Sequence, residues 1–403
     1  MSMPFLKEMT ISRICIFLFL IFNVGCYFAE LSSLVSLSYV FLLGGCFVSL
    51  MEKRRFPNIV FVMWILAFLA YSFVSVLWSY SVDLTFQSII ILLKVAITVI
   101  CFYYMLQSKE DFQFSLGALS LAGVLWGILY LSLLDFDISV LSNNRFYSGN
   151  DNFFDMPNLN VVSLYLSFSF VYFSFMFFRT KNVCTLILAI VALFLIVVLG
   201  SRKSIISIVI CLALIFPKLH KSNKVQLIAF IFISLFLLVS FIPSEYISFV
   251  SERLGQLNFL AEEIKLDESD QIRVALFDRG IDYSMDAPIL GNGFYVFSQL
   301  FNRDCGIAFY SHNNFIETYV GGGLVGFLMY YVMYIYLFLK VYRRSALFDY
   351  QYLCFLLLLI LIFNHVGIVV LLDRFVWLLL AIIYAGTLYM NNNVSYRKTR
   401  HVA

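Results

Sequence analysis

Residues 183–217 read VCTLILAIVALFLIVVLG, then SRKS, then IISIVICLALIFP. Two apolar runs flank four polar residues, and each run approaches the roughly 20 residues that a helix needs to cross a bilayer. Backbone groups in lipid must find their hydrogen bonds within the protein, and these runs are too long for barrel strands. The pattern therefore predicts two membrane helices that are joined by a tight turn.

Similar apolar runs recur along the whole chain, which is 62% hydrophobic and 13% charged and has a mean hydropathy of +0.92. A soluble domain cannot bury this much apolar surface. We therefore predict an all-α polytopic membrane protein, with residues 1–403 forming a single integral membrane domain. The runs predict about twelve transmembrane helices, at 11–29, 32–51, 58–78, 84–106, 112–134, 158–178, 183–200, 204–217, 224–243, 315–339, 350–371 and 375–391.

The distribution of Lys and Arg predicts the orientation. With a cytoplasmic N-terminus, the inner loops and ends hold 17 of the 27 basic residues, as the positive-inside rule requires. Both termini are then cytoplasmic. Two outer loops are long, at 135–157 and at 244–314 between the ninth and tenth helices, and the second has room for short helices at 251–254 and 270–281. Long loops on a compact scaffold are usually functional, so we expect the active face to be extracytoplasmic.

The sequence lacks the motifs that are typical of several classes of site chemistry. The eight cysteines lie mostly within predicted helices, which gives no disulfide framework. The sequence contains no CxxC, HExxH, P-loop or Rossmann glycine pattern. We predict neither a metal nor a cofactor, and no nucleic-acid partner.

The segment from Tyr310 to Glu317 places ionisable groups at the predicted start of a membrane helix, at the boundary between water and membrane. Such groups are costly at membrane depth and are functional candidates by default. The positive end of the helix dipole disfavours a charged imidazole, so His312 can accept a proton near neutral pH. Asn313 and Glu317 share a helix face, and both are candidates for substrate binding. A structural histidine, and a Glu317 that pairs with a loop cation, are the alternatives.

The SRKS turn presents Arg202 and Lys203 on the outer face, where cations are disfavoured. An Arg side chain pairs bidentately with phosphate oxygens, and the N-terminus of the next helix also favours anions. Ser201 and Ser204 are candidate caps for that helix. Anchoring to lipid headgroups is the alternative to an anion clamp.

Arg273 and Arg279 lie six residues apart in the large loop. On one helix, six residues turn through about 600°, so the two side chains do not point at one target. Arg273 is the stronger candidate for a direct role. The alternative is an ion pair with Asp270, Asp278 or Asp282.

Four further features of the sequence have a structural interpretation beside a functional one. Arg374, in a short outer turn, is a candidate phosphate contact or a partner of its neighbour Asp373. For His365, within the eleventh predicted span, an interhelical hydrogen bond is favoured over catalysis. Lys94 lies alone in the fourth span. The GxxxG pattern at 322–326 predicts close helix packing.

Three motifs, taken in order, resemble the bacterial O-antigen polymerase and O-antigen ligase superfamily. They are Gly200-Ser201-Arg202, then Arg273 followed by residues 288–294 (PILGNGF), and then residues 312–317 (HNNFIE) followed by 322–327 (GGLVGF). Pro157-Asn158 adds a further family feature, and together the motifs cover roughly residues 155–340. Family members often carry Trp after the loop arginine, where this chain has Phe277.

The resemblance implies a multi-pass glycosyltransferase of the bacterial inner membrane that acts on undecaprenyl-pyrophosphate-linked oligosaccharides at the periplasmic face. Arg202 and Arg273 would hold the pyrophosphate and His312 would deprotonate the acceptor hydroxyl, in an inverting displacement without metal or nucleotide. Candidate substrate contacts are Arg279, Lys203, Asn313, Glu317, Arg374, Arg145 and Asn158.

The resemblance favours a polymerase, and two other functions stay open as alternatives. A Wzy-type polymerase, which is a hexosyltransferase-type enzyme, would join lipid-linked repeat units into O-antigen or a related surface polysaccharide. A ligase would use the same chemistry to transfer polymer to lipid A-core. A transporter or flippase for a lipid-linked glycan is the third, although such proteins commonly show repeats and broken midplane helices. Membrane lipids and a chain-length regulator are the other partners that the resemblance implies.

Overall fold

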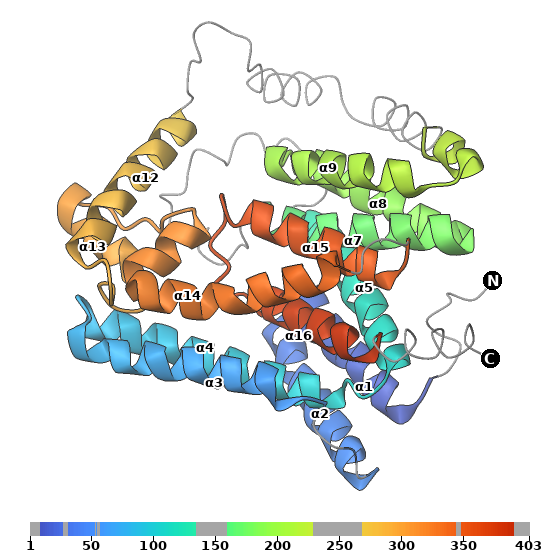
Figure 1. Ribbon diagram of the computed structural model, residues 1–403, viewed down its shortest axis with the longest axis horizontal. Helices are drawn as coiled ribbons and strands as arrows, with labels where there is room; N and C mark the ends of the chain where they lie inside the picture. The colour runs from blue at the N-terminus through green and yellow to red at the C-terminus, as the bar shows by residue number, and fades with distance from the viewer. Residues whose placement is uncertain are drawn as a thin grey trace, which may run out of the picture. The chain divides into compact units, whose positions relative to one another are not determined.

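A computed structural model of the protein describes residues 9–26, 31–52, 54, 57–133, 159–228, 268–343 and 348–390. This part of the chain is helical and contains no strand (Figure 1), as the apolar runs predict. Six of its helices are long and apolar enough to cross a membrane: α2 (Ser32–Met51), α3 with η4 (Ile59–Trp78), α4 (Val82–Met105), α5 (Lys109–Leu133), α7 (Leu159–Thr180) and α14 (Asn314–Tyr342). The exact number of spans stays a prediction.

Four shorter apolar helices complete the set of membrane-type helices in the described ranges. They are α1 with η2 (Ile11–Gly25), α8 (Val183–Val198), α15 (Tyr350–Asn364) and α16 (Arg374–Tyr389). Side-chain caps fix several of their starts, because an Asn or Asp oxygen accepts a hydrogen bond from a first-turn amide. Asn182 accepts from the Cys184 amide, and Asp373 accepts from the Val376 amide.

The structure corrects one predicted span. The run 350–371 is not a single helix, because α15 ends at Asn364 and residues 365–373 form turns that lead to the Asp373 cap. His365 therefore lies just past the helix end and not within the span. Apolarity alone does not reveal this, since residues 366–372 are as apolar as the helix before them.

The chain divides into two compact units, each described here by itself. The first comprises residues 1–52, 110–264 and 344–360, and the second comprises residues 53–109, 265–343 and 361–403. The single-domain interpretation of the sequence stays a prediction.

The first unit is held by polar contacts between packed helices. Arg13 Nε donates to Asp111 Oδ1 at 2.9 Å, which pairs two nearly buried charges on α1 and α5. Burial of either charge alone would be costly. Farther along α5, the Ser169 hydroxyl of α7 donates to the Ser120 carbonyl at 2.7 Å. The next part of the chain, α8 and α9 (Arg202–Lys218), packs against α7.

The second unit has an aromatic core between α3, α4, α14 and α16. Trp64 stacks on Trp377 with ring centroids 5.1 Å apart, and Phe61 stacks on Tyr384 at the same separation. Such pairs add about 0.5–1.5 kcal/mol each beyond the area they bury. The Trp64 indole also donates to the Met329 carbonyl at 2.8 Å.

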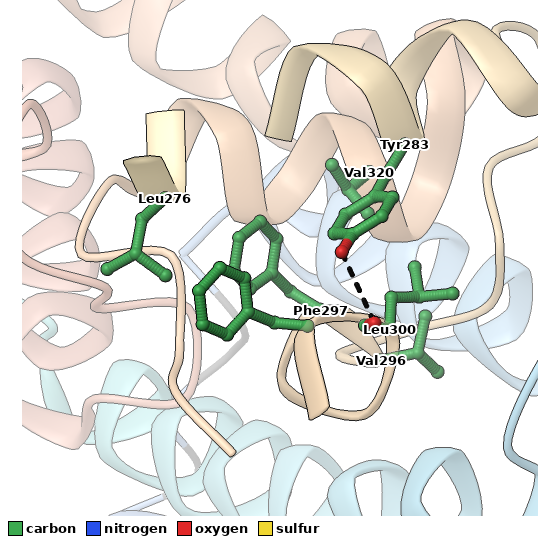
Figure 2. Close-up of a cluster of buried hydrophobic side chains, with 7 residues drawn as sticks. Leu276, Tyr283, Val296, Phe297, Leu300 and Val320 are labelled. Carbon is green, nitrogen blue, oxygen red and sulfur yellow. Dashed lines mark hydrogen bonds between the residues drawn. The ribbon is translucent and has the colours of Figure 1, made fainter. Parts of the chain in front are cut away.

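Two helices from the predicted outer loop pack on α14. α12 (Glu268–Asp286) covers the predicted helix at 270–281, and α13 (Phe297–Cys305) follows it, whereas 251–254 lies outside the described residues. Figure 2 shows the apolar cluster that joins them, in which the Tyr283 hydroxyl donates to the Leu300 carbonyl at 3.2 Å. The cluster consists of Leu276, Tyr283, Val296, Phe297, Leu300, Phe301 and Val320.

The helix α14 is broken at Gly323, which has φ 57° and ψ −164°. The loop before α13 fills the break. The Leu324 amide donates to the Pro288 carbonyl at 2.9 Å, and the Gly293 amide donates to the Gly321 carbonyl at 3.1 Å. A break at membrane depth is tolerated only where other groups satisfy the exposed backbone, and this loop does so.

The glycine pattern of α14 therefore serves two purposes. Gly326 packs closely against Tyr71 of α3, since a Cβ there would lie 2.7 Å from the Tyr71 ring. The prediction of close helix packing holds at this position. Gly323 instead allows the break, because its positive φ suits glycine and a Cβ would collide with the Ile289 backbone. The pattern alone did not predict the break.

Candidate active site

His312 lies in a turn that hydrogen bonds hold on both sides. Its φ of 52° falls in the left-handed region, which is uncommon for a residue with a Cβ. The Ser311 amide donates to Glu317 Oε2 at 3.1 Å, and the Ser311 hydroxyl donates to the Asn313 carbonyl at 2.8 Å. Such conformations persist where the surroundings over-determine them, and they concentrate at functional sites.

Asn313 fixes the imidazole at the positive end of α14. Its Oδ1 accepts from the Phe315 amide at 2.9 Å and from the Ile316 amide at 3.3 Å, which caps the helix. His312 directly precedes this cap, at the positive end of the helix dipole. The ring stacks on Tyr310, with centroids 4.0 Å apart and an interplanar angle of 34°. The capping role is local, and the predicted contact of Asn313 with substrate stays a prediction.

Glu317 is buried, with 1% of its surface exposed, and lines a pocket within the second unit. The pocket holds about 290 Å³ of empty space, including its part open to the surroundings. Its lining residues are Phe68, Tyr71, Ser72, Ser75, Phe294, Tyr295, Glu317, Thr318, Gly321, Gly322, Gly326 and Leu371. Aromatic rings, hydroxyls and one carboxyl group thus meet at the break in α14.

Tyr295 in this pocket was not singled out from the sequence. It has φ 63°, the left-handed conformation seen also at His312. Burial, followed by the nearby charge of Glu317, raises the pKa of Tyr295 above its ordinary value. Its hydroxyl therefore keeps its proton at neutral pH and can donate a hydrogen bond. A left-handed tyrosine two residues after Gly293 has no sequence signature, because its loop is folded against a helix almost 30 residues later.

Arg273 and Arg279 have different surroundings on α12. This helix crosses the first turn of α14 at Gly280, whose missing Cβ leaves room for the Ile316 side chain. Arg273 lies seven residues before Gly280, which is about two turns and about 10 Å along the same face. Arg279 is on the exposed side, and its NH1 lies 3.7 Å from Asp282 Oδ2. The structure thus separates the two arginines, as their spacing indicates.

A further cation, Arg303 on α13, was not singled out from the sequence. Its Nε donates to Asp304 Oδ1 at 2.6 Å, and its guanidinium lies over the rings of Tyr80 and Tyr283. The hydrogen bond from Arg303 is the main reason that the pKa of Asp304 falls to about 2. The sequence signals this cluster of Arg303, Asp304, Tyr80 and Tyr283 only by an Arg-Asp pair near the end of a nine-residue amphipathic segment.

The remaining candidates occupy helix starts or undescribed segments. Arg374 is the first residue of α16, in the same compact unit as His312. Arg202 and Lys203 begin α9 in the first unit, after Gly200 with φ 60°. Arg145 and Asn158 lie outside the described residues.

The predicted cap of α9 is wrong in one detail. Ser201 occupies the cap position but makes no side-chain cap hydrogen bond. Its hydroxyl instead lies 3.4 Å from Asn160 Oδ1 and 3.3 Å from the Ser204 hydroxyl. These contacts tie the turn to α7 and α9, so the side chain that the pattern assigned to the helix end is used for packing between helices.

Residues 187–331 match the family model described as O-antigen ligase. The matched segment begins in α8 and ends in α14, and it includes Arg202, Arg273 and His312. The match confirms the predicted resemblance to the O-antigen polymerase and ligase superfamily, and it supports a membrane enzyme of the glycosyltransferase type. No curated protein matches the chain significantly. Within the described residues, no group of three His, Cys, Asp or Glu side chains is arranged to hold a metal.

Proposed function

We propose that the protein is a polymerase of O-antigen or a related surface polysaccharide in the bacterial inner membrane. It transfers an undecaprenyl-pyrophosphate-linked glycan onto a sugar hydroxyl of another lipid-linked repeat unit at the periplasmic face. The observation that carries this proposal is the His312 turn. An imidazole is held in a left-handed conformation at a helix N-terminus, inside a segment that matches the O-antigen ligase family.

The reaction is a single displacement at the anomeric carbon. His312 accepts the proton of the acceptor hydroxyl as the hydroxyl oxygen forms its bond to that carbon. The bond to the lipid pyrophosphate breaks, and the pyrophosphate leaves with the electron pair. Because attack and departure occur on opposite faces, the configuration inverts. A positioned general base contributes about 10²–10⁴-fold to such a step.

Arg202 and Arg273 stabilise the negative charge that develops on the departing pyrophosphate. Guanidinium groups suit this task because their planar donors match phosphate oxygens. Removal of one such electrostatic contact costs about 10²–10³-fold in rate in comparable sites. The position of Arg273 on the α14-facing side of α12 supports this role, and the surface ion pair of Arg279 supports a minor one.

Ser311 and Glu317 act on the base through the backbone. Glu317 accepts the Ser311 amide, so its carboxyl group fixes the residue that directly precedes His312. A carboxyl group buried at this position orients the turn without contacting the reacting sugar. We therefore assign Glu317 to positioning rather than to substrate contact.

The ligase is the second candidate, since the matched family model carries that description. Purified protein incubated with undecaprenyl-pyrophosphate repeat units alone distinguishes the two. A ladder of lengthening products supports the polymerase. Product that forms only after addition of lipid A-core identifies a ligase. Absence of covalent product in both mixtures, together with movement of the lipid across a vesicle bilayer, would overturn both and identify a transporter.

A further inference from the structure

Asn314 joins the first turn of α14 to the turn between α15 and α16. Its side chain is fully buried, and Oδ1 accepts from the Val370 amide at 2.9 Å. Its backbone amide donates to the His365 carbonyl at 2.8 Å. Buried hydrogen bonds of this kind hold together the segments that they connect. These contacts all lie within the second compact unit.

Tyr331 and His365 extend these contacts. We call the hydrogen-bonded residues Asn314, Tyr331, His365 and Val370 the joint. Asn314 Nδ2 donates to the Tyr331 hydroxyl at 2.9 Å, and that hydroxyl lies 3.2 Å from His365 Nδ1. This contact joins the hydroxyl to the imidazole, and the tautomer of His365 decides which of the two donates. The buried ring packs edge-on against Phe315 and Tyr334, with centroids 5.7 Å and 5.2 Å apart.

The two ends of this joint are candidate site residues. On one side, Asn314 follows the cap Asn313 and lies two residues after His312. On the other side, the Val370 carbonyl accepts from the Asp373 amide at 3.0 Å, and Asp373 caps the helix that begins with Arg374. A continuous set of hydrogen bonds therefore connects the His312 turn with the start of α16.

We infer that Asn314, Tyr331 and His365 are positioning residues that set the His312 turn relative to Arg374. This inference rests on the proposed function, in which His312 is the base, and on the prediction from the sequence that Arg374 contacts phosphate. Displacement of a reacting group by about 1 Å can cost about 10²-fold in rate, so a loosened joint lowers kcat. Substrate affinity depends less on the joint, because neither Tyr331 nor His365 is exposed to substrate.

The relative position of the two segments is tested without an activity assay. Spin labels are attached to Ile307→Cys and Val366→Cys, which replace exposed residues on the two sides of the joint, after substitution of the native cysteines. The parent is expected to give one narrow distance distribution, and Asn314→Leu and Tyr331→Phe are expected to broaden it. The matched control is Tyr334→Phe, which keeps the ring that packs on His365 and removes a buried hydroxyl of α14 that bonds Tyr330 and not His365. A narrow, unchanged distribution in both variants would refute the joint.

The functional part is tested by steady-state kinetics on the same proteins. Tyr331→Phe and Asn314→Asp, which keeps an acceptor for Val370 but loses the donor to Tyr331, are expected to lower kcat by about 10–100-fold with KM nearly unchanged. Tyr334→Phe is expected to match the parent. A broadened distribution with unchanged kcat, or a fall in kcat with a narrow distribution, would overturn the positioning role. A parent that performs no transfer refutes the proposed function, whereas the distance measurement still decides the joint.

Discussion

The turns that present His312 and Arg202 are built in different ways. At Arg202 the bend is made by Gly200, which adopts φ 60° without a Cβ, and the neighbouring Ser201 does not cap the helix. At His312 the left-handed residue is the histidine itself, and hydrogen bonds of Ser311, Asn313 and Glu317 hold the turn. The difference fits the proposed roles, in which a base that meets a hydroxyl needs a fixed ring and a long guanidinium reaches its anion from a simpler turn.

Removal of the imidazole is expected to have the largest effect. His312→Ala should lower the rate of chain extension by about 10²–10⁴-fold, because the acceptor hydroxyl loses its base. The measurement is product formation from purified protein and lipid-linked repeat units. The control is His220→Ala, which removes an exposed histidine of the first unit. Parental extension by His312→Ala would mean that the turn does not present the base.

The two arginines of α12 provide a comparison within one helix, because Arg273 lies on the face toward α14 and Arg279 on the exposed face. Arg273→Ala is expected to lower kcat/KM for the lipid-linked donor by about 10²-fold, since it removes a contact to the leaving pyrophosphate. Arg279→Ala is expected to change it less than about threefold, because a surface ion pair with Asp282 contributes about 0–1 kcal/mol. Equal losses in the two variants would contradict the assignment by helix face.

The break in α14 is expected to affect stability rather than chemistry directly. Gly323→Ala forces a Cβ into the Ile289 backbone at positive φ, which should destabilise the fold by about 1–3 kcal/mol or more. Thermal unfolding in detergent measures this. Gly306→Ala is the matched control, since Gly306 also has positive φ (73°) but open space around it. A larger loss at Gly306 would show that the inserted loop does not hold the break.

The smallest effect is expected from Glu317→Gln, in which the side chain keeps a hydrogen-bond acceptor. Glu317→Gln retains an oxygen for the Ser311 amide and should leave kcat within about threefold of the parent, whereas Glu317→Ala should lower it about tenfold or more. The pH–rate profile is expected to stay unchanged in Glu317→Gln, because the carboxyl group positions the turn without exchanging the substrate proton. A large loss in Glu317→Gln would assign the carboxyl group to the chemistry.

The sequence predicts much of the helix pattern, because hydropathy reports lipid burial directly. The spans at 32–51 and 183–200 agree with α2 and α8 to within two residues. The polar motif at His312 also identifies the segment that matches the family model. These features depend on local composition, which a single sequence contains.

Contacts between distant segments are the part that the sequence does not reveal. The break at Gly323 needs the loop at 287–293 to supply its hydrogen bonds, and the end of α15 at Asn364 leads into a turn that Asn314 anchors. Neither feature changes the local hydropathy. The left-handed conformation of Tyr295 likewise depends on its contact with α14, so sequence patterns gave no reason to include it in the site.

The most direct test of the account is the anomeric configuration of the newly formed linkage. Nuclear magnetic resonance of the extended product, compared with the lipid-linked donor, determines it in one experiment. We predict inversion, because His312 primes a hydroxyl that attacks opposite the departing pyrophosphate in a single step. Retention of configuration would exclude a single displacement from the opposite face and would contradict the account.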